Sequence, residues 1–375
     1  MRRRVLLLGT AGMVAGACKA PVPGRYLLTV TTADGVSVVD DNGRVVRGPR
    51  DVSAAAPDWG RMVSAVADGP DTRVALQDRR GELSHVTLRG RLEPRIVSPD
   101  GRLVASVTPG GAGVYGLHEP GGRDRTTIVV SGTVSGVDGE LYRLDLPGNL
   151  EPEAFSPDNE RLYVLDFLPP GKPDRYRTAV VDLQEGRLTP IEAEPTQAHR
   201  VVRVHDERRG RLFAICAREG EAYLHCVDQA PARVHRIDLP PPFGSGRPGV
   251  HGLALSQDRL CAVHSLSAKV AEIDPDSLVL KEVTTFANAP QDGKPGVAFT
   301  PDGRLVVSLD GKLIATDPHL EVPMPGEPRG LVIGPSGDVW AGHPGGVVRI
   351  DPSTGRETGR VGIPGLYVLK QVSNA

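Results

Sequence analysis

The 375-residue sequence contains few aromatic residues and few cysteines. Phe, Trp and Tyr together make up 4% of the chain, and tryptophan occurs only at Trp59 and Trp340. This composition argues against a flat cofactor held among tryptophans, and we expect no cofactor. None of the four cysteines belongs to a Cys-x-x-Cys pair, so zinc and dithiol redox motifs have no support.

Excess charge and catalytic motifs are scarce as well. The formal net charge is −2, so no bulk field would attract nucleic acid or an acidic membrane. The chain lacks a Gly-x-Ser-x-Gly elbow, a His-Glu-x-x-His motif and a phosphate-binding glycine loop. Each of these motifs carries a known chemistry, so their absence from the sequence favours a protein that is not an enzyme.

The cysteines beyond the N-terminal segment are odd in number. Cys216 and Cys226 flank the turn at 218–221 and could face each other across a hairpin, while Cys261 stands apart. Alternatively, all three are small buried hydrophobic residues. The sequence leaves both interpretations open.

The first eighteen residues have the pattern of an export signal. Three arginines at positions 2–4 precede a short apolar stretch at 5–17, which is too short to span a bilayer comfortably. The small residues before Cys18 resemble a bacterial lipobox, although Ala15 stands where leucine is usual. An ordinary cleaved signal peptide is the alternative. We expect residues 1–18 to be a signal peptide lipidated at Cys18, residues 19–24 a short linker, and residues 25–375 a single domain.

Glycine and proline are abundant, with 45 and 34 residues, and many of them belong to one repeated unit. The stretch TPDGRLVVSL at 300–309 is a Pro-Asp-Gly turn followed by a short apolar strand, and SPDGRLVASV at 98–107 is almost the same. Proline presets the first corner of such a turn, and glycine accepts the left-handed backbone that closes it. The repeat therefore predicts many hairpins of short buried strands.

Two series of turns give the number of repeats. The first series has an acidic or polar corner at Asp58, Asp100, Asp158, Asp206, Asp258, Asp302 and Ser336. The second series follows an apolar-acidic pair and falls at Asp40, Asp78, Glu119, Asp182, Asp228, Asp274, Asp317 and Asp351. Repeats of about 40–50 residues that contain several short strands indicate a β-propeller. We name the strands of each blade a to d from the channel outward, so the first series joins a to b and the second joins c to d.

Seven a–b turns against eight c–d turns mean that one blade lacks its own inner strand. We assign this gap to the first blade, where 26–30, 36–40 and 44–46 supply strands b, c and d. The apolar segment 366–372 would be its inner strand and would close the ring, because closure removes exposed sheet edges. We therefore predict an all-β, eight-bladed propeller, with seven blades as the alternative.

These repeats resemble the bacterial YVTN-type propeller family, in which a Pro-Asp-Gly turn, a strand and an Ile-Asp-x-x-Thr-Gly segment follow one another. The segments at 300–317 and 345–361 show the pattern. The resemblance covers roughly residues 25–364 and implies the fold. It also implies a binding or scaffolding role outside the cytoplasm, since many members are exported and have no assigned reaction.

The candidate site lies where the inner strands begin. In a propeller, the d–a and b–c connections surround one mouth of the central channel, and the d–a connections here pair a proline with a charged neighbour. We predict that a net positive ring formed by Arg95, Glu153, Arg203, His251, Lys294 and Arg329 binds a polar or acidic ligand. A solvated rim of ordinary surface charges is the alternative.

The b–c connections add Asp166, Asp310, His264 and His343 to this mouth. Histidines and carboxylates are typical metal ligands. These four come from different blades and lack motif spacing, so we do not predict a metal site. Three places exceed the needs of the repeat and are further places where function could lie. They are the longest insert, at 121–150, which carries strand-like segments at 126–130 and 141–146, and the loops at 167–176 and 240–244.

We therefore predict a monomeric, membrane-anchored binding module for a polar or acidic ligand or an envelope protein, on the extracytoplasmic face. A secreted form is the alternative location. A lactonase- or glycosidase-like hydrolase and a purely structural envelope protein are the alternative functions.

The lipid anchor gives the first testable prediction. The change Cys18→Ala should release the protein from the membrane into the medium, because the lipid chains attached at this residue would be absent. Cell fractionation and immunoblotting measure the release. A Cys18→Ala protein that stays with the membrane would contradict the anchor.

Overall fold

The computed structural model describes residues 25–78, 81–110, 121–132, 139–191, 194–245, 247, 249–286, 293–316 and 319–375. The expected signal peptide with Cys18, the linker at 19–24, and the turn positions Glu119 and Asp317 lie outside the described residues.

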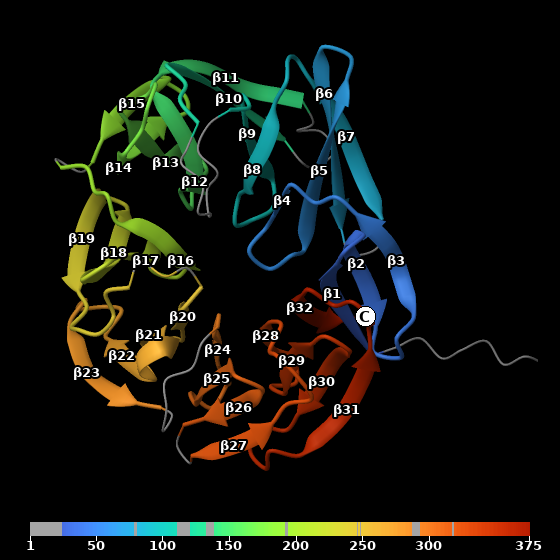
Figure 1. Cartoon of the computed structure of the whole chain (residues 1–375). Coiled ribbons are helices and arrows are strands. Elements are labelled where there is room, and N and C mark those ends of the chain that lie inside the picture. Colours follow the sequence, from blue (N-terminus) through green and yellow to red (C-terminus); the bar gives the residue numbers. More distant parts are fainter. Residues whose placement is uncertain are drawn as a thin grey trace, which may run out of the picture.

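The described residues form eight sheets of four strands around a central axis, so the eight-bladed prediction is confirmed and the seven-bladed alternative is wrong. Figure 1 shows the ring viewed along this axis, with one strand of every sheet next to the channel and one at the periphery. All pairings within the sheets are antiparallel, as expected for strands joined by short turns.

The first four blades contain the following strands, in order from the channel outward. Blade one contains β32 (Val368–Asn374), β1 (Tyr26–Thr32), β2 (Gly35–Asp40) and β3 (Val45–Arg50). Blade two contains β4 (Ala54–Ala55), β5 (Arg61–Asp68), β6 (Asp71–Asp78) and β7 (Glu82–Leu88). Blade three contains β8 (Glu93–Val97), β9 (Leu103–Val107), β10 (Arg125–Gly132) and β11 (Gly139–Pro147). Blade four contains β12 (Asn149–Phe155), β13 (Arg161–Leu168), β14 (Arg175–Asp182) and β15 (Arg187–Pro190).

The other four blades follow the same order. Blade five contains β16 (His199–Asp206), β17 (Arg211–Arg218), β18 (Glu221–Gln229) and β19 (Ala232–Asp238). Blade six contains β20 (His251–Leu255), β21 (Leu260–His264), β22 (Lys269–Ile273) and β23 (Leu280–Thr285), with a short 3₁₀ helix η1 (Ser265–Ser267) after β21. Blade seven contains β24 (Gly296–Phe299), β25 (Leu305–Leu309), β26 (Lys312–Ala315) and β27 (Leu320–Pro323). Blade eight contains β28 (Leu331–Ile333), β29 (Val339–His343), β30 (Gly346–Ile350) and β31 (Glu357–Gly362).

The repeated turn forms as its chemistry predicts. In blade three, Ser98 Oγ donates to Asp100 Oδ1 at 2.5 Å, and the Arg102 N–H donates to the same carboxylate oxygen at 3.0 Å. Gly101 takes a left-handed φ of 70°, which an L-residue with a side chain rarely adopts. All seven predicted a–b turns lie between the first and second strands of their blades.

One predicted c–d turn is wrong. The third and fourth strands of blade three are β10 and β11, so their connection falls at 133–138 and cannot contain Glu119. The stretch 121–150 holds these two strands, which confirms the strand-like segments predicted at 126–130 and 141–146, although they belong to the regular blade and not to an insert. The extra length of blade three instead lies between β9 and β10.

The C-terminal strand completes blade one. β32 pairs antiparallel with β1, with Leu28 opposite Val372 and Thr31 opposite Val368. Leu366, Leu369 and Val372 of this end of the chain are buried in one core cluster with residues of blades one and eight. The predicted closure is confirmed, although the strand begins at Val368 rather than at Leu366.

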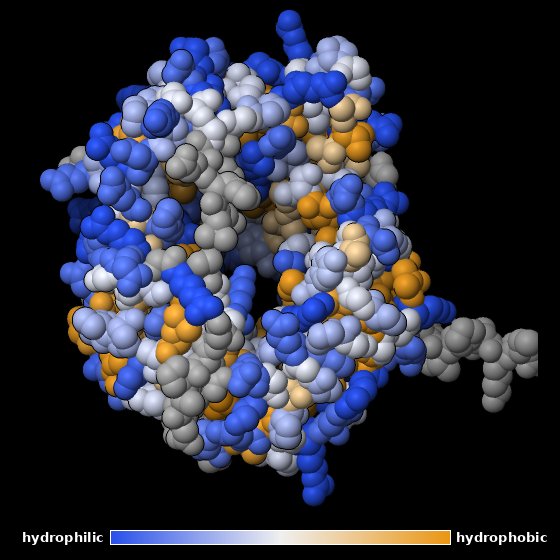
Figure 2. Space-filling model, in the orientation of Figure 1, coloured by the Kyte–Doolittle hydropathy of each residue, from blue (hydrophilic) through white to orange (hydrophobic). Residues whose placement is uncertain are grey.

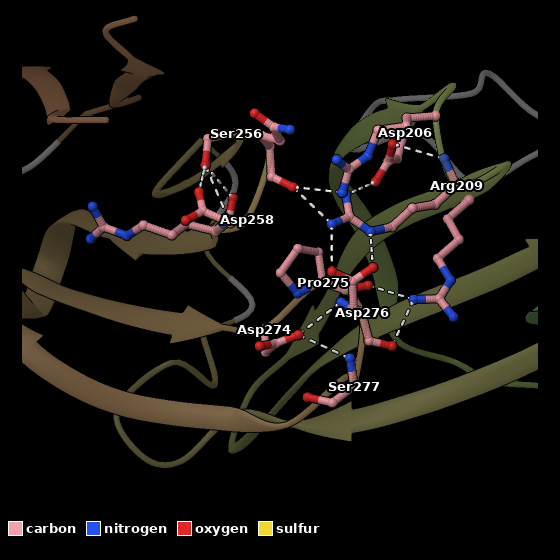
Figure 3. Close-up of polar contacts among 12 residues, drawn as sticks. Asp206, Arg209, Ser256, Asp258, Asp274, Pro275, Asp276 and Ser277 are labelled. Atoms are coloured by element: carbon pink, nitrogen blue, oxygen red, sulfur yellow. Dashed lines mark hydrogen bonds and ion pairs between the residues drawn. The ribbon is translucent and has the colours of Figure 1, made fainter. Parts of the chain in front are cut away.

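Arginines near the a–b turns link neighbouring blades. Figure 3 shows Arg209 of blade five, whose Nη1 donates to Asp206 at 2.8 Å and whose Nε donates to Asp276 of blade six at 2.6 Å. Arg259 of blade six donates to the Gly303 carbonyl at 2.9 Å, and Arg304 of blade seven donates to the Pro352 carbonyl at 2.8 Å. The Arg259 and Arg304 bonds satisfy turn carbonyls of the following blade, and the bonds between blades add directional contacts to the apolar packing.

The cysteines and one loop serve the core. Cys216 pairs across the hairpin with Tyr223, and Cys226 pairs with Phe213, so the disulfide alternative is wrong and all three cysteines are free and buried. The loop at 240–244 places Phe243 in the core cluster of blades five and six with 0% exposure. This loop therefore fills an interior position, contrary to our expectation of a functional loop.

Among the described residues, no helix is long and apolar enough to cross a membrane.

Ring closure gives the second prediction. Truncation after Pro364 removes β32 and three buried side chains, each worth about 2–5 kcal/mol when cut back to alanine in a packed core. The free energy of unfolding, measured with urea, should fall by most of its value, and the protein should aggregate through the exposed edge of β1. Removal of only the exposed Asn374 and Ala375 is the control. An unchanged unfolding midpoint in the long truncation would contradict the role of β32.

Candidate functional site at the channel mouth

The central channel remains partly open to solvent. The inner strands β24 and β28 consist entirely of half-buried residues, and β16 contains five of them in a row. Because these strands pack against neighbouring blades on both sides, their remaining exposure is toward the channel. Figure 2 shows a hollow at the centre of the ring, with hydrophilic residues over much of the surrounding rim.

Several inner strands contain a β-bulge near the residue that we predicted as functional. The register shifts between Pro94 and Ile96 in β8 and between Pro152 and Ala154 in β12, which leaves Arg95 and Glu153 as the extra residues. A third bulge, in β32, leaves Lys370 unpaired with β1. Bulges redirect side chains and are common beside functional sites.

Arg95 is held by carboxylates of two blades. Its Nη2 lies 2.5 Å from Glu93 Oε2, and its Nε lies 2.6 Å from Oε1 of Glu151 on β12. Arg123 approaches the same Glu151 at 3.5 Å and donates to the carbonyls of Thr108 and Leu150. We call Glu93, Arg95, Arg123 and Glu151 the blade-three cluster. It contains two cations and two carboxylates, so its formal charge is zero when all four are ionised.

Glu153 is likewise committed to an ion pair. Its side chain is 1% exposed and accepts from Arg200 of β16, whose side chain is 2% exposed. Arg200 Nη2 also lies 3.0 Å from His225 Nδ1, and Arg203 donates to the Glu153 carbonyl at 2.8 Å. Arg203 is more exposed than Arg200, with 31% of its side chain accessible to solvent.

The predicted His251 is buried rather than exposed at the mouth. Its Nε2 donates to the Phe243 carbonyl at 2.9 Å, and its ring centre lies 4.9 Å from that of His264. Burial, together with the neighbouring His251, lowers the pKa of His264 to about 4, and burial also lowers the pKa of His251. Both rings are therefore neutral at neutral pH. His251 is wrong as a member of a charged ring.

The other residues of the b–c connections do not gather around one point. Arg177 donates to Asp166 at 3.0 Å. Burial raises the pKa of Asp166 and this arginine opposes the rise. His343 accepts from the Gly345 N–H at 3.2 Å, and Asp310 lies in an exposed turn with a φ of 46°. Within the described ranges, no group of three His, Cys, Asp or Glu side chains has the geometry to hold a metal ion.

Three cations on the opposite side of the ring have no carboxylate partner among the residues that the structure describes. These are Lys294, Arg329 and Lys370, which we call the cationic triad. The Arg329 guanidinium donates to the Leu366 carbonyl, and the Leu369 N–H donates to the Arg329 carbonyl at 2.8 Å, so Arg329 lies beside the bulge of β32. Burial lowers the pKa of Lys370, and the positive charge of Lys294 lowers it further.

An aromatic ring lies close to this triad. Lys370 Nζ is 5.5 Å from the ring centre of Trp59, which belongs to the a–b turn of blade two. Tyr367, which is 53% exposed, comes three residues earlier, and its N–H donates to the Thr31 carbonyl at 2.8 Å. A ligand that binds the triad would therefore find apolar and aromatic surface as well as positive charge.

The structure thus divides the predicted ring in two. Arg95, Glu153 and Arg203 belong to ion-pair clusters of blades three to five, whereas Lys294 and Arg329 belong to the triad of blades seven, eight and one. Sequence reasoning missed Glu151, Arg123, Arg200 and Lys370. A signal for Lys370 was present, because a lysine in the middle of the apolar segment LYVLKQV is unusual for a buried strand.

Comparison with known proteins supports the fold. No family model and no curated protein matches the sequence. Two structures of AztD from Citrobacter koseri, one of them the apo form, align with TM-scores of 0.56 and 0.58 at 13% and 12% identity, each over 94% of this chain and 97% of AztD. A structure of a eukaryotic initiation factor aligns with a TM-score of 0.51 at 12% identity, over 94% of this chain and 98% of the other. At these identities the likeness shows the propeller architecture alone.

The buried ion pair of Glu153 gives the third prediction. Arg200→Met removes the near partner of the buried Glu153 and leaves only Arg203, 3.9 Å away, which should lower the free energy of unfolding by about 3 kcal/mol. Arg203→Met removes a partly exposed partner and should lower it by about 1 kcal/mol or less. Urea unfolding of both variants measures the difference. If both variants lost the same free energy of unfolding, the buried ion pair between Glu153 and Arg200 would be no stronger than the partly exposed one with Arg203.

Proposed function

We propose that this protein is an exported, lipid-anchored β-propeller that binds an anionic ligand at the mouth of its channel. The ligand would carry a carboxylate, phosphate or acidic sugar group, either as a small molecule or as an acidic segment of an envelope protein. The anchor at Cys18, the extracytoplasmic location and the monomeric state are part of this proposal.

The proposal of an anionic ligand rests on the cationic triad. Lys370 is half-buried, has no carboxylate partner in the described part of the chain, and lies near enough to Lys294 for the two charges to repel. Ammonium groups in such a setting are unfavourable without a counter-charge. An anion would supply it, and the low-dielectric walls of a narrow channel would strengthen the attraction.

The arrangement of these side chains also favours specific binding of an anion over a diffuse layer of counter-ions. Arg329 offers a planar fork of donors suited to carboxylate or phosphate oxygens, and the two lysines add point charges from different blades. The indole of Trp59 gives the bound group an aromatic neighbour. The ring holds the three cations in place, because each comes from an inner strand or from the loop just before one.

The fourth prediction tests this site on the chain beginning at Lys19. Sulfate and a galacturonate trimer serve as probes in isothermal titration calorimetry. The double change Lys294→Ala and Lys370→Ala should weaken binding by roughly tenfold for each ammonium group removed, because each makes a charge-assisted hydrogen bond to the anion. Wild-type affinity should also fall between about 20 and about 200 mM NaCl, because salt screens the charges.

The matched control is Lys281→Ala. Lys281 lies on β23 at the periphery, where its Nζ is 3.2 Å from Asp274, so its removal should leave affinity unchanged. Normal binding by the double variant would place the anion site elsewhere. Absence of binding by the wild-type chain would favour the structural role, and conversion of a lactone or glycoside by that chain would favour the hydrolase.

A further inference from the structure

Glu151 is an unusual carboxylate for the mouth of a channel. Its side chain is 0% exposed, and neither carboxylate oxygen has a hydrogen-bond partner of good geometry. The group is held by charge alone, with Arg95 Nε at 2.6 Å and Arg123 Nη2 at 3.5 Å. Water cannot solvate it, so its ionised form depends on these two arginines.

The two arginines differ in their freedom. The Arg123 side chain is 8% exposed, and its donations to Thr108 and Leu150 carbonyls fix it in place. The Arg95 side chain is 22% exposed and is shared between Glu93, which is 45% exposed, and Glu151. Arg95 is therefore the member of the blade-three cluster that can take a new partner from solvent.

We propose that the blade-three cluster is a second anion site, which opens when Glu151 takes up a proton. The proton comes from water and binds a carboxylate oxygen of Glu151, which removes one negative charge. The cluster then changes from a formal charge of zero to +1. Arg95, no longer needed by Glu151, turns its guanidinium toward a carboxylate, sulfate or phosphate group in the mouth. This site shares no residue with the cationic triad.

The pKa of Glu151 determines the pH at which the cluster changes its charge, and this pH is near neutral. Burial raises the pKa of Glu151 from its usual 4.5 to about 7, against the opposing effect of Arg95 and Arg123, and Glu93 adds to the rise. Asp166, the neighbouring carboxylate on β13, is paired with Arg177. Since the pKa is raised on folding, the folded protein binds this proton more tightly than the unfolded chain does. The stability contributed by proton binding is complete below about pH 4.5 and is lost as the pH rises through about 7.

The fifth prediction isolates the second site. In the Lys294→Ala, Lys370→Ala chain, which lacks the triad lysines, sulfate should bind about tenfold more tightly at about pH 6 than at about pH 8, following the protonated fraction of Glu151. Sulfate suits the test because it remains a dianion over this range. Calorimetry in two buffers with different ionisation enthalpies should show net proton uptake on binding.

Three variants added to this background separate the roles of the residues. Glu151→Gln imitates the protonated carboxyl, so it should bind sulfate at both pH values with the affinity seen near pH 6 and without proton uptake. Arg95→Met should abolish the binding at both pH values. Asp145→Asn is the matched control, because it removes an exposed carboxylate of the same blade that pairs with Arg125 at 3.0 Å outside the cluster, and it should keep the pH dependence.

Carbon-13 NMR of the glutamate side-chain carboxyls provides a readout without any ligand. One carboxyl of the wild-type chain should titrate near pH 7, and its signal should be missing in Glu151→Gln. A Glu151 that titrates near 4.5 would overturn the inference, as would unchanged pH dependence in Glu151→Gln or no sulfate binding near pH 6 in the background chain. Failure of the triad alone would leave these results unaffected, so the two proposals are tested separately.

Discussion

Closure of the ring is the constraint on which the other features depend. Each blade contacts only its two neighbours, so the ring is complete only if the first and last blades share a sheet. Pairing of β1 with β32 achieves this and buries Leu369 and Val372 against blades one and eight. The same strand carries Lys370 to the channel, because its bulge lies at that residue. The element that joins the two ends of the chain therefore also supplies part of the candidate site, and a ring that failed to close would lack both.

The turns and the number of blades could be predicted because their chemistry is local. The Ser-x-Asp hydrogen bond at Asp100 and the left-handed Gly101 lie within a few residues of each other, so the sequence contains all the information needed to form them. Glu119 misled the prediction for the same reason. Its Glu-Pro-Gly surroundings look like a turn, but only the pairing of β10 with β9 shows that the third strand of the blade comes later.

The sequence allowed us to predict which residues lie near the channel mouth, but not which residues they pair with. Prolines mark where inner strands begin, and this placed Arg95, Glu153, Lys294 and Arg329 near the mouth. Their partners come from other blades: Glu151 of blade four joins Arg95 of blade three, and Arg200 of blade five joins Glu153 of blade four. No local pattern encodes such pairs. The burial of His251 had the same cause, since Phe243 and its loop cover it from a direction that the sequence of β20 does not reveal.

Charged side chains are distributed unevenly around the channel mouth. Buried ion pairs are costly to desolvate, and apolar side chains of similar size often serve stability as well or better. Blades three to five nevertheless keep two such clusters on bulged inner strands, where each carboxylate is matched by arginine. Across the channel, blades seven, eight and one present Lys294, Arg329 and Lys370, none of which pairs with a carboxylate in the described part of the chain. A ring that binds an anion gains a potential that falls from one side of its mouth to the other, with a titratable carboxylate on the neutral side to adjust it.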